Sequence, residues 1–413
     1  MSTRRDFLRI GGSIWGGLNL PWLLAAGASA QNCIIFFQEG GACQHDSFDP
    51  KPDQPSDIRG SFGTIPTSVP GIHFSELLPR CAKSFKKFAV IRSMYSKEAI
   101  HEKAKQYIFS GARPNNAFKH PVYGSVVAKE LGARQGLPPF VCIPRKDISA
   151  DAGLLGPAYD PFITGDPGRK EFKVQDLALP TGVSLEETAS RARLLSALDA
   201  GIRHAEKSKV VEGMDHFYQK AFDLVSSAAA RKAFNLDEEP DALRDEYGRN
   251  GAGQGALLAR RLVESGVRLA AVFQGGYDSH TNNDAASKKI FPVFDQAFVA
   301  LIGDLEQRGL LATTLVLGIG EFGRTPHINH SSGRDHWPGV FSIAAAGAGI
   351  QGGQIIGSSD AQGGAPKDRP ISIEDLGATL YKKLGIDFHK EYRANGRPVK
   401  INSDGTPVRE LFG

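Results

Sequence analysis

The feature that most constrains this chain is a repeated alternation between short apolar runs and longer amphipathic segments. Runs rich in β-branched and aromatic residues predict buried strands, and they lie at residues 33–37, 87–94, 138–144, 268–276, 313–319 and 340–347. Amphipathic segments between them predict helices at residues 101–110, 288–309 and 372–385. Strands that alternate with helices predict an α/β fold with a mostly parallel sheet and helices on both faces.

Composition sets wider limits. The chain has 413 residues, of which 41% are hydrophobic and 23% charged, as in ordinary soluble globular proteins. A stretch rich in glycine, proline and aspartate at 151–181 predicts a surface insertion, and a charged amphipathic stretch at about 185–235 predicts a helical insertion. The net charge of +4 comes without a basic run interleaved with aromatic residues, which argues against a nucleic-acid partner. The four cysteines show no CxxC spacing and do not resemble a disulfide framework.

The N-terminus carries a targeting pattern. Arg4 and Arg5 precede an uncharged stretch that ends in the small-residue triplet at 28–30. Twin arginines before a weakly hydrophobic run are typical of a twin-arginine export signal. The alternative is a permanent anchor, which the glycines, proline and asparagine of the run disfavour. We therefore predict a signal peptide over residues 1–30, the twin-arginine export machinery as a partner, and a periplasmic or secreted protein that contacts the membrane only through an uncleaved signal.

Acidic and histidine side chains follow several of the predicted strands. In an open α/β sheet, ligands bind beyond the carboxyl ends of the strands, so these side chains are the first candidates for a site. Asp46 follows the first strand, Asp278 and His280 follow a later one, Glu321 follows the next, and His336 precedes the last. Each cluster alone resembles an ordinary polar turn, but the fold would bring successive strand ends together.

Mixed carboxylate and imidazole ligands indicate which metals such a site would hold. Zinc and manganese accept both donor types, whereas calcium prefers oxygen ligands alone. We therefore expect one or more divalent metal ions, with zinc or manganese favoured and calcium or magnesium as alternatives. Two such ions can bind an anionic ester and stabilise charge on its attacking and leaving oxygens.

Several motifs carry a family resemblance. "GGACQHDSFDPKP", "GEFGRTP", "GRDHWPGVFSI" and "PVRELFG" closely resemble those of a bacterial family known as domain of unknown function number 1501, whose members often carry a twin-arginine signal. That family is similar, more distantly, to the alkaline phosphatase and sulfatase superfamily. The resemblance implies one domain over residues 31–413, folded as an alkaline-phosphatase-like three-layer αβα sandwich with a mostly parallel central sheet.

The superfamily pattern implies roles for individual residues. An aspartate and a histidine a few residues apart hold one metal after one strand, and Asp278 and His280 match them. An acidic residue after the next strand serves the second metal, and Glu321 stands there, followed by Phe322 instead of a second ligand. A histidine before the following strand completes the first site, and His336 fits this position.

Two positions depart from the superfamily pattern. The first strand ends in "QEGG" rather than in an acidic ligand, and Asp46 comes several residues later. The superfamily nucleophile is a Ser, Thr or modified Cys at the start of a helix, whereas His101 stands at that place with no hydroxyl or thiol beside it. Three interpretations of His101 stay open: a nucleophile, a metal ligand or general acid, and a structural residue at the helix start.

Other residues of these loops have less specific roles. Arg324 and Arg334 could each hold an anionic substrate bidentately or make surface salt bridges. Cys43 is expected to be a small buried residue rather than a thiolate ligand. His327 and His330 lie in the middle of their loop and are predicted to face solvent.

Two functions are compatible with these residues. The first is an exported metal-dependent hydrolase of phosphate or sulfate esters, acting on a small anionic ester or a sulfated polysaccharide, with His101 nearest the reacting group and Arg324 assisting anion binding. Its metal ligands would be Asp46, Asp278, His280, Glu321 and His336. The second is a non-catalytic periplasmic or envelope protein that keeps the fold and a structural metal, and the missing hydroxyl or thiol favours it.

Overall fold

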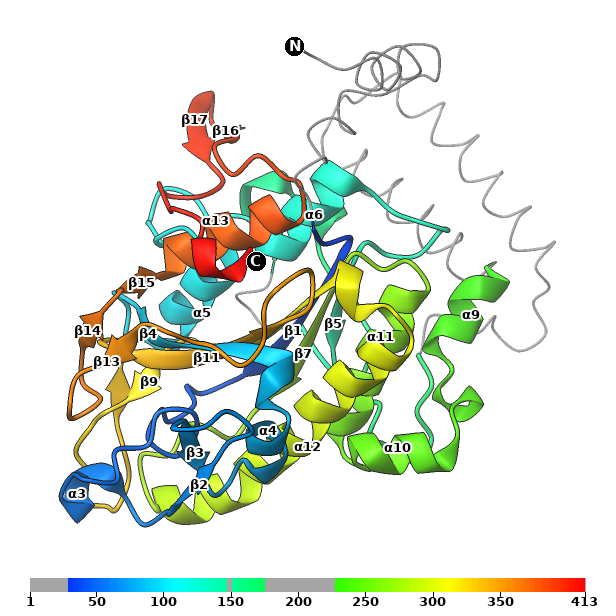
Figure 1. Cartoon of the computed structure of the whole chain (residues 1–413). Coiled ribbons are helices and arrows are strands. Elements are labelled where there is room, and N and C mark those ends of the chain that lie inside the picture. The colour runs from blue at the N-terminus through cyan, green and yellow to red at the C-terminus, as the bar shows by residue number, and fades with distance from the viewer. Residues whose placement is uncertain (1–28, 147–150, 175–226, 413) are drawn as a thin grey trace, which may run out of the picture.

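Figure 1 shows the computed structural model of the chain, which describes residues 29–146, 151–174 and 227–412. A nine-stranded sheet lies at its centre. The predicted signal peptide, except for residues 29–30, and most of the predicted helical insertion lie outside the described residues. Among the described helices, none combines the length and the apolar character that crossing a bilayer requires.

The central sheet is mostly parallel. β11 runs antiparallel to its neighbours β4 and β8, and the other pairs of the sheet are parallel. A ninth strand, β15 (Ile371–Ser372), pairs with β4. The structure thus confirms the predicted α/β fold with a mostly parallel sheet. The strand order is β12 (Ile355–Ile356), β4 (Phe88–Tyr95), β11 (Phe341–Ala346), β8 (Thr314–Ile319), β1 (Asn32–Gln38), β7 (Leu269–Gln274), β5 (Phe140–Ile143) and β6 (Phe162–Ile163).

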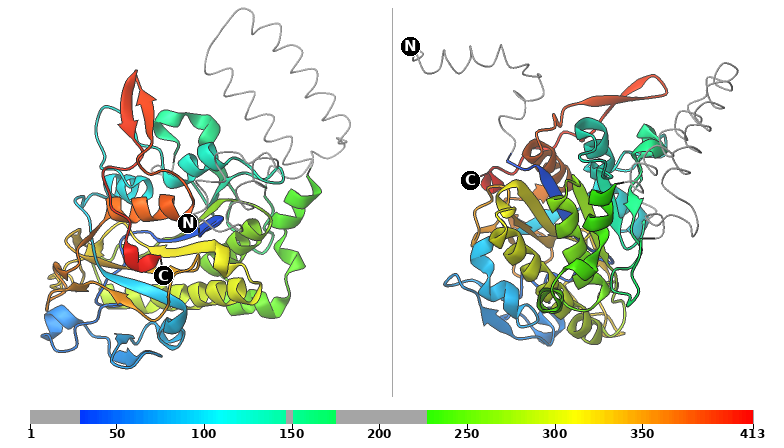
Figure 2. Two further views of the ribbon diagram at one scale, coloured as in Figure 1. Left: turned by 45° about the horizontal axis from the view of Figure 1, so that its top comes forward. Right: turned by 90° about the vertical axis from the view of Figure 1, so that its right-hand side faces the viewer.

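Helices cover both faces of the sheet, because successive side chains of a buried strand point to opposite faces. From β1, Ile35 and Phe37 pack on one side, and Ile34 and Phe36 pack on the other. Figures 1 and 2 show the resulting three layers. The first face is covered by α5 (His101–Ser110), α6 (Tyr123–Leu131) and α13 (Ile373–Lys383), and the second by α4 (Pro79–Lys83), α9 (Ala228–Phe234), α10 (Asp241–Tyr247), α11 (Gly251–Glu264) and α12 (Asn283–Gln307).

Local signals account for several helix ends. α5 ends at Ser110 and is capped by Gly111, which adopts the left-handed conformation with φ of 67°, as its sequence predicts. α13 begins after Ser372, whose side chain forms a capping box with Asp375. The helix predicted at 288–309 begins earlier, at Asn283, and ends at Gln307.

The insertion predicted at 151–181 is not entirely a surface loop, because β6 within it pairs with β5 at the edge of the sheet. Residues after 174 in this insertion lie outside the described part of the chain. The remaining elements are short: α3 (Ser56–Arg59), β2 (Thr64–Pro66), β3 (His73–Ser75), β9 (Gly323–Arg324), β10 (His336–Trp337), β13 (Ser358–Ser359), β14 (Pro366–Asp368), β16 (Glu391–Ala394) and β17 (Arg397–Lys400).

The strand register brings the candidate residues to one edge of the sheet. β1 pairs with β7 as far as Gln38 and Gln274, and with β8 as far as Phe37 and Ile319. β4 ends at the same edge, and the antiparallel β11 begins there. The loops after β1, β4, β7 and β8, and the loop before β11, therefore leave the sheet side by side.

Candidate metal centre

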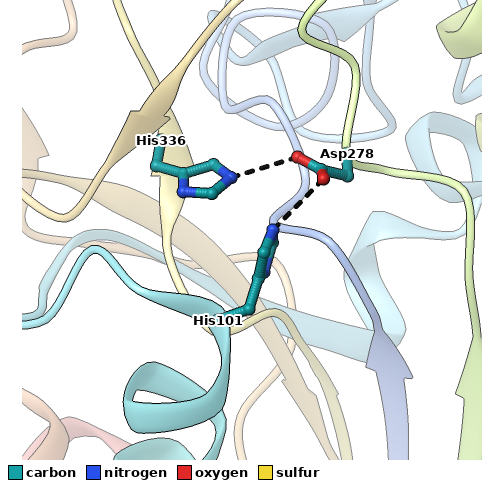
Figure 3. Close-up of side chains that lie close together, drawn as sticks. All are labelled: His101, Asp278 and His336. Atoms are coloured by element: carbon teal, nitrogen blue, oxygen red, sulfur yellow. Dashed lines mark hydrogen bonds and ion pairs between the residues drawn. The ribbon is translucent and has the colours of Figure 1, made fainter.

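Three histidines and one aspartate meet at this edge. His101 is the first residue of α5, Asp278 and His280 lie in the loop after β7, and His336 lies in β10, just before β11. β10 pairs with β9, which places His336 opposite Arg324. Figure 3 shows Asp278 facing both His101 and His336.

Asp278 is the centre of this cluster. Its Oδ1 atom lies 3.1 Å from Nε2 of His336 and 3.1 Å from Nε2 of His280, and its Oδ2 atom lies 3.3 Å from Nε2 of His101. Ligand atoms of His101, Asp278 and His336 all lie within 4.8 Å of one another. Ligands at about 2.0–2.2 Å from one ion have such separations, so these side chains could share a metal.

Each of the three imidazoles is held by an acceptor on its other nitrogen. Nδ1 of His336 donates to the carbonyl oxygen of Ala99 at 2.8 Å, and Nδ1 of His280 donates to Oδ1 of Asp335 at 2.6 Å. Nδ1 of His101 donates to Oε1 of Glu321 at 2.8 Å. These acceptors place the proton on Nδ1 of each neutral imidazole, which leaves the Nε2 lone pair to face Asp278.

This donor set fits a divalent cation. The Nε2 atoms of His280 and His336 are 3.0 Å apart, beside the carboxylate of Asp278. Lone pairs that face one another at this distance repel unless a cation or a proton lies between them. Nε2 of His101 is buried and approaches Asp278 without hydrogen-bond geometry, and no other described residue is its partner. Two or three imidazoles with one carboxylate is a ligand set typical of zinc and related ions.

The protonation tendencies of two members also match ligation. Burial lowers the pKa of His336 below its usual value, although the Ala99 carbonyl and Asp278 oppose this. Burial raises the pKa of Asp278, but hydrogen bonds and charge from Arg324, together with His336 and His101, outweigh burial and hold it well below its usual value. The hydrogen bond that His101 donates to Glu321 raises the pKa of His101, against the effect of burial. A neutral His336 and an ionised Asp278 are the forms that bind a metal.

Glu321 supports the cluster from behind. The sequence analysis predicts it as a metal ligand, but its side chain is fully buried and is held by protein donors. Its two oxygens accept the backbone N–H of Gly40 at 3.0 and 3.2 Å, and Oε1 also accepts Nδ1 of His101. Glu321 is therefore placed to orient His101.

Arg324 is fully buried beside Asp278. Nε donates to the carbonyl of Gly41 at 3.0 Å, and Nη1 donates to the carbonyl of Arg334 at 3.0 Å. Nη2 donates to the carbonyl of Gly40 and to Oδ1 of Asp278, the latter at 2.7 Å. Every guanidinium nitrogen has a protein acceptor, so these contacts differ from the predicted role in anion binding and instead compensate the charge of Asp278.

Asp46 lies outside the cluster, which differs from its predicted role as a ligand. Its Oδ2 atom accepts hydrogen bonds from Asn283 at 2.7 Å and from Ser287 at 2.8 Å. Burial raises the pKa of Asp46, and Arg334 is the charge that counteracts this most. The late position of Asp46 after the first strand, which departs from the superfamily pattern, thus has a structural consequence. The loop directs this carboxylate to the start of α12 instead of to the cluster.

Phe322 packs against two of the histidines, and the sequence does not predict these contacts. Its ring packs against His336, with centroids 4.6 Å apart, and against His101, with centroids 5.0 Å apart. The sequence also does not predict that Asp335 and the Ala99 carbonyl accept hydrogen bonds from His280 and His336, because these partners lie far apart in the sequence. The signal for Phe322 is its position beside Glu321, where the superfamily pattern has a second ligand.

The remaining histidines and Cys43 do not join the cluster. His327 and His330 are exposed, as predicted, and Nδ1 of His327 lies 2.8 Å from Oδ2 of Asp57. Cys43 is buried, and burial raises the pKa of its thiol to about 12, which disfavours a thiolate. His45 is buried and donates from Nε2 to the carbonyl of Gln362 at 2.7 Å.

The fold and this cluster define an α/β protein with a candidate metal centre at the carboxyl edge of a mostly parallel sheet. The chain belongs to the family described as "Protein of unknown function (DUF1501)", which matches residues 30–412. No curated protein matches it in sequence.

Several solved structures are similar to this chain over most of its length. One is a sulfatase from Pseudoalteromonas sp., with 14% identity and a TM-score of 0.39, over 88% of this chain and 70% of that one. Another is a protein in the alkaline phosphatase superfamily from Vibrio parahaemolyticus, with 10% identity and a TM-score of 0.38, over 90% of this chain and 76% of that one. A third is a phosphonate monoester hydrolase from Silicibacter pomeroyi, with 11% identity and a TM-score of 0.39, over 93% of this chain and 76% of that one.

Proposed function

We propose that this protein is an exported metal-dependent hydrolase of phosphate or sulfate esters. One observation carries the proposal: three imidazole Nε2 atoms converge on Asp278 while each Nδ1 atom is held by its own acceptor. Acceptors of this kind fix the tautomer and orientation of metal-binding histidines.

The residues that would hold the ion are Asp278, His280 and His336, with His101 completing the set. Nitrogen and oxygen donors together favour zinc or manganese, with calcium or magnesium as alternatives. A bound divalent ion would polarise an oxygen of the ester and stabilise negative charge on it. Arg324 keeps Asp278 ionised, and Glu321 fixes the orientation of His101, which would be the side chain nearest the reacting group.

The N-terminal sequence supports the cellular context of the proposal. Arg4 and Arg5 precede an uncharged run with a small-residue ending, as in twin-arginine signals. The protein would then meet its substrate in the periplasm or outside the cell. A small anionic ester or a sulfated polysaccharide is the substrate class that the superfamily resemblance suggests.

A second candidate function is a non-catalytic protein that keeps a structural metal. Two observations favour it: His101 has no hydroxyl or thiol beside it, and each guanidinium nitrogen of Arg324 is bound to protein acceptors. The two candidates predict the same metal and differ in turnover.

Turnover of aryl phosphate and aryl sulfate esters by the purified protein separates them. The hydrolase predicts metal-dependent release of the aryl alcohol that His336→Ala abolishes and that the exposed control His330→Ala leaves intact. Bound metal without turnover on any ester of the panel would support the structural candidate instead.

A further inference from the structure

Asp46 anchors the start of α12 from the loop that follows β1. It is buried, with 1% of its surface exposed. Its Oδ2 atom accepts hydrogen bonds from Nδ2 of Asn283 and from Oγ of Ser287, at 2.7 and 2.8 Å. Both donors belong to the first turns of α12, whose N-cap residue Asn282 makes no side-chain capping bond within the described chain. The carboxylate therefore fixes this end of the helix to the β1 loop.

Asn283 connects this anchor to the metal centre. Its Oδ1 atom accepts a hydrogen bond of 2.6 Å from Oγ of Ser279, the residue between Asp278 and His280. The two hydrogen bonds run in the same direction. The hydroxyl of Ser279 donates to the amide oxygen of Asn283, and the amide nitrogen of Asn283 donates to the carboxylate of Asp46. Two side-chain hydrogen bonds thus connect Asp46 to the loop after β7, called the ligand loop below because it carries Asp278 and His280.

Both links are shielded from water. Asn283 is 2% exposed and Ser279 is 7% exposed. The loop is also held from the other side, because the backbone N–H of Arg334 donates to the carbonyl of Ser279 at 2.9 Å. When one member of such a buried chain is lost, water does not replace it, and its partner is left unsatisfied or moves. A displacement of about 1 Å is enough to spoil a ligand set.

We propose that Asp46 is a positioning residue of the metal centre, which holds Asp278 and His280 in place through Asn283 and Ser279. The inference rests on the proposed metal centre, because a positioned ligand set presupposes a ligand. It gives the aspartate of the "QHD" motif a role that needs no direct contact with a metal.

The test compares variants that break the series of hydrogen bonds from Ser279 through Asn283 to Asp46 with a variant that breaks an equivalent hydrogen bond outside it. Ser279→Ala and Asp46→Ala remove the two ends of this series. Ser287→Ala is the matched control, because it removes the other hydrogen bond to Asp46, which does not lead to the ligand loop. The dissociation constant of Zn²⁺ is measured by competition with a chelator, and the Tm of each metal-free variant is measured in parallel.

We expect Ser279→Ala and Asp46→Ala to weaken Zn²⁺ binding by about 10-fold or more, as loss of a supporting contact behind a metal ligand does. Asp46→Asn keeps an acceptor oxygen for Asn283 and should retain more affinity than Asp46→Ala. Ser287→Ala should bind Zn²⁺ as the wild type does, even where its Tm is lower. Relative to the wild type, the double variant of Asp46 and Ser279 should bind Zn²⁺ more weakly by much less than the product of the two single effects.

Two results would overturn the inference: wild-type affinity in Ser279→Ala, or an equal loss of affinity in Ser279→Ala and Ser287→Ala. Neither of these results would affect the proposed function, because the wild type would still bind Zn²⁺. A wild type that does not bind Zn²⁺ would instead refute the metal centre itself, and the role of Asp46 with it.

Discussion

Glu321 and His101 form a hydrogen bond of 2.8 Å that joins a fully buried carboxylate to the first residue of α5. The same carboxylate accepts the backbone N–H of Gly40, so it is fixed to the loop after β1 as well. The orientation of His101, for which the sequence left three interpretations open, is thus fixed by a buried acceptor.

Replacing Glu321 should weaken metal binding without removing a ligand. Glu321→Ala leaves Nδ1 of His101 and the N–H of Gly40 without their acceptor, and we expect about 10- to 100-fold weaker binding of Zn²⁺. Glu321→Gln keeps one acceptor oxygen and should lose less. Calorimetric titration of the metal-free variants measures both, and equal affinity in wild type and Glu321→Ala would contradict a role of Glu321 in orienting His101 for metal binding.

His280 and His327 offer a comparison between a histidine in the cluster and one outside it. Both are paired with an aspartate through Nδ1, His280 with Asp335 and His327 with Asp57. Of these two histidines, only His280 directs Nε2 toward Asp278. We expect His280→Ala to reduce metal affinity by more than about 10-fold and His327→Ala to leave it unaltered. A similar loss in both variants would indicate a general effect of removing surface histidines.

Phe322 should contribute mainly through packing. Its ring is fully buried and lies against both His101 and His336. Phe322→Ala is expected to lower the free energy of unfolding by about 3–5 kcal/mol, as truncation of a buried aromatic residue does. Phe322→Leu fills much of the space and should lose less. Urea denaturation of the metal-free proteins measures the difference, and a loss well under 1 kcal/mol in Phe322→Ala would contradict this packing.

The lowered pKa of buried His45 predicts that the protein loses stability in mild acid. Burial, with the charge of Arg334, lowers its pKa to about 4, while the Gln362 carbonyl and Asp49 oppose this and Lys51 adds to it. Between its usual pKa near 6.5 and about 4, the unfolded chain binds a proton that the folded protein does not, so stability falls as the pH falls. At pH 5, the resulting loss in the free energy of unfolding is about 2 kcal/mol.

The variant His45→Gln tests this window, because glutamine can donate to Gln362 but does not titrate. The free energy of unfolding is measured at pH 7.5 and pH 5 for both proteins. The wild type should lose about 2 kcal/mol more than the variant over this interval. Parallel losses would show that His45 is not the group responsible.

The six longer strands of the central sheet (β1, β4, β5, β7, β8 and β11) could be predicted from the sequence because they are buried runs with clear boundaries. β1, for example, is buried at every position, and its apolar letters alone indicate a central strand. The same logic places Asp278 and His336 at one edge, since each adjoins a strand end. β6 could not be predicted, because a two-residue edge strand leaves no periodicity to detect.

The partners of each polar residue could not be predicted in the same way. Asp46 and Arg324 are residue types that are common in metal and anion sites. In the structure, however, Asp46 contacts Asn283, and Arg324 contacts the carbonyls of the β1 loop. Such choices depend on where loops far apart in sequence meet after folding. Residue type and strand position therefore indicated where the candidate cluster lies, whereas tertiary hydrogen bonding decides which residues face it.

Titration of the metal-free protein with Zn²⁺ or Mn²⁺ tests the central claim most directly. The account predicts a specific binding site that raises Tm and that His336→Ala removes. At a free metal concentration of 100 times Kd, binding should add about 2.7 kcal/mol to the free energy of unfolding. An unaltered Tm with either ion, together with no bound metal in the purified protein and no effect of chelation, would contradict it.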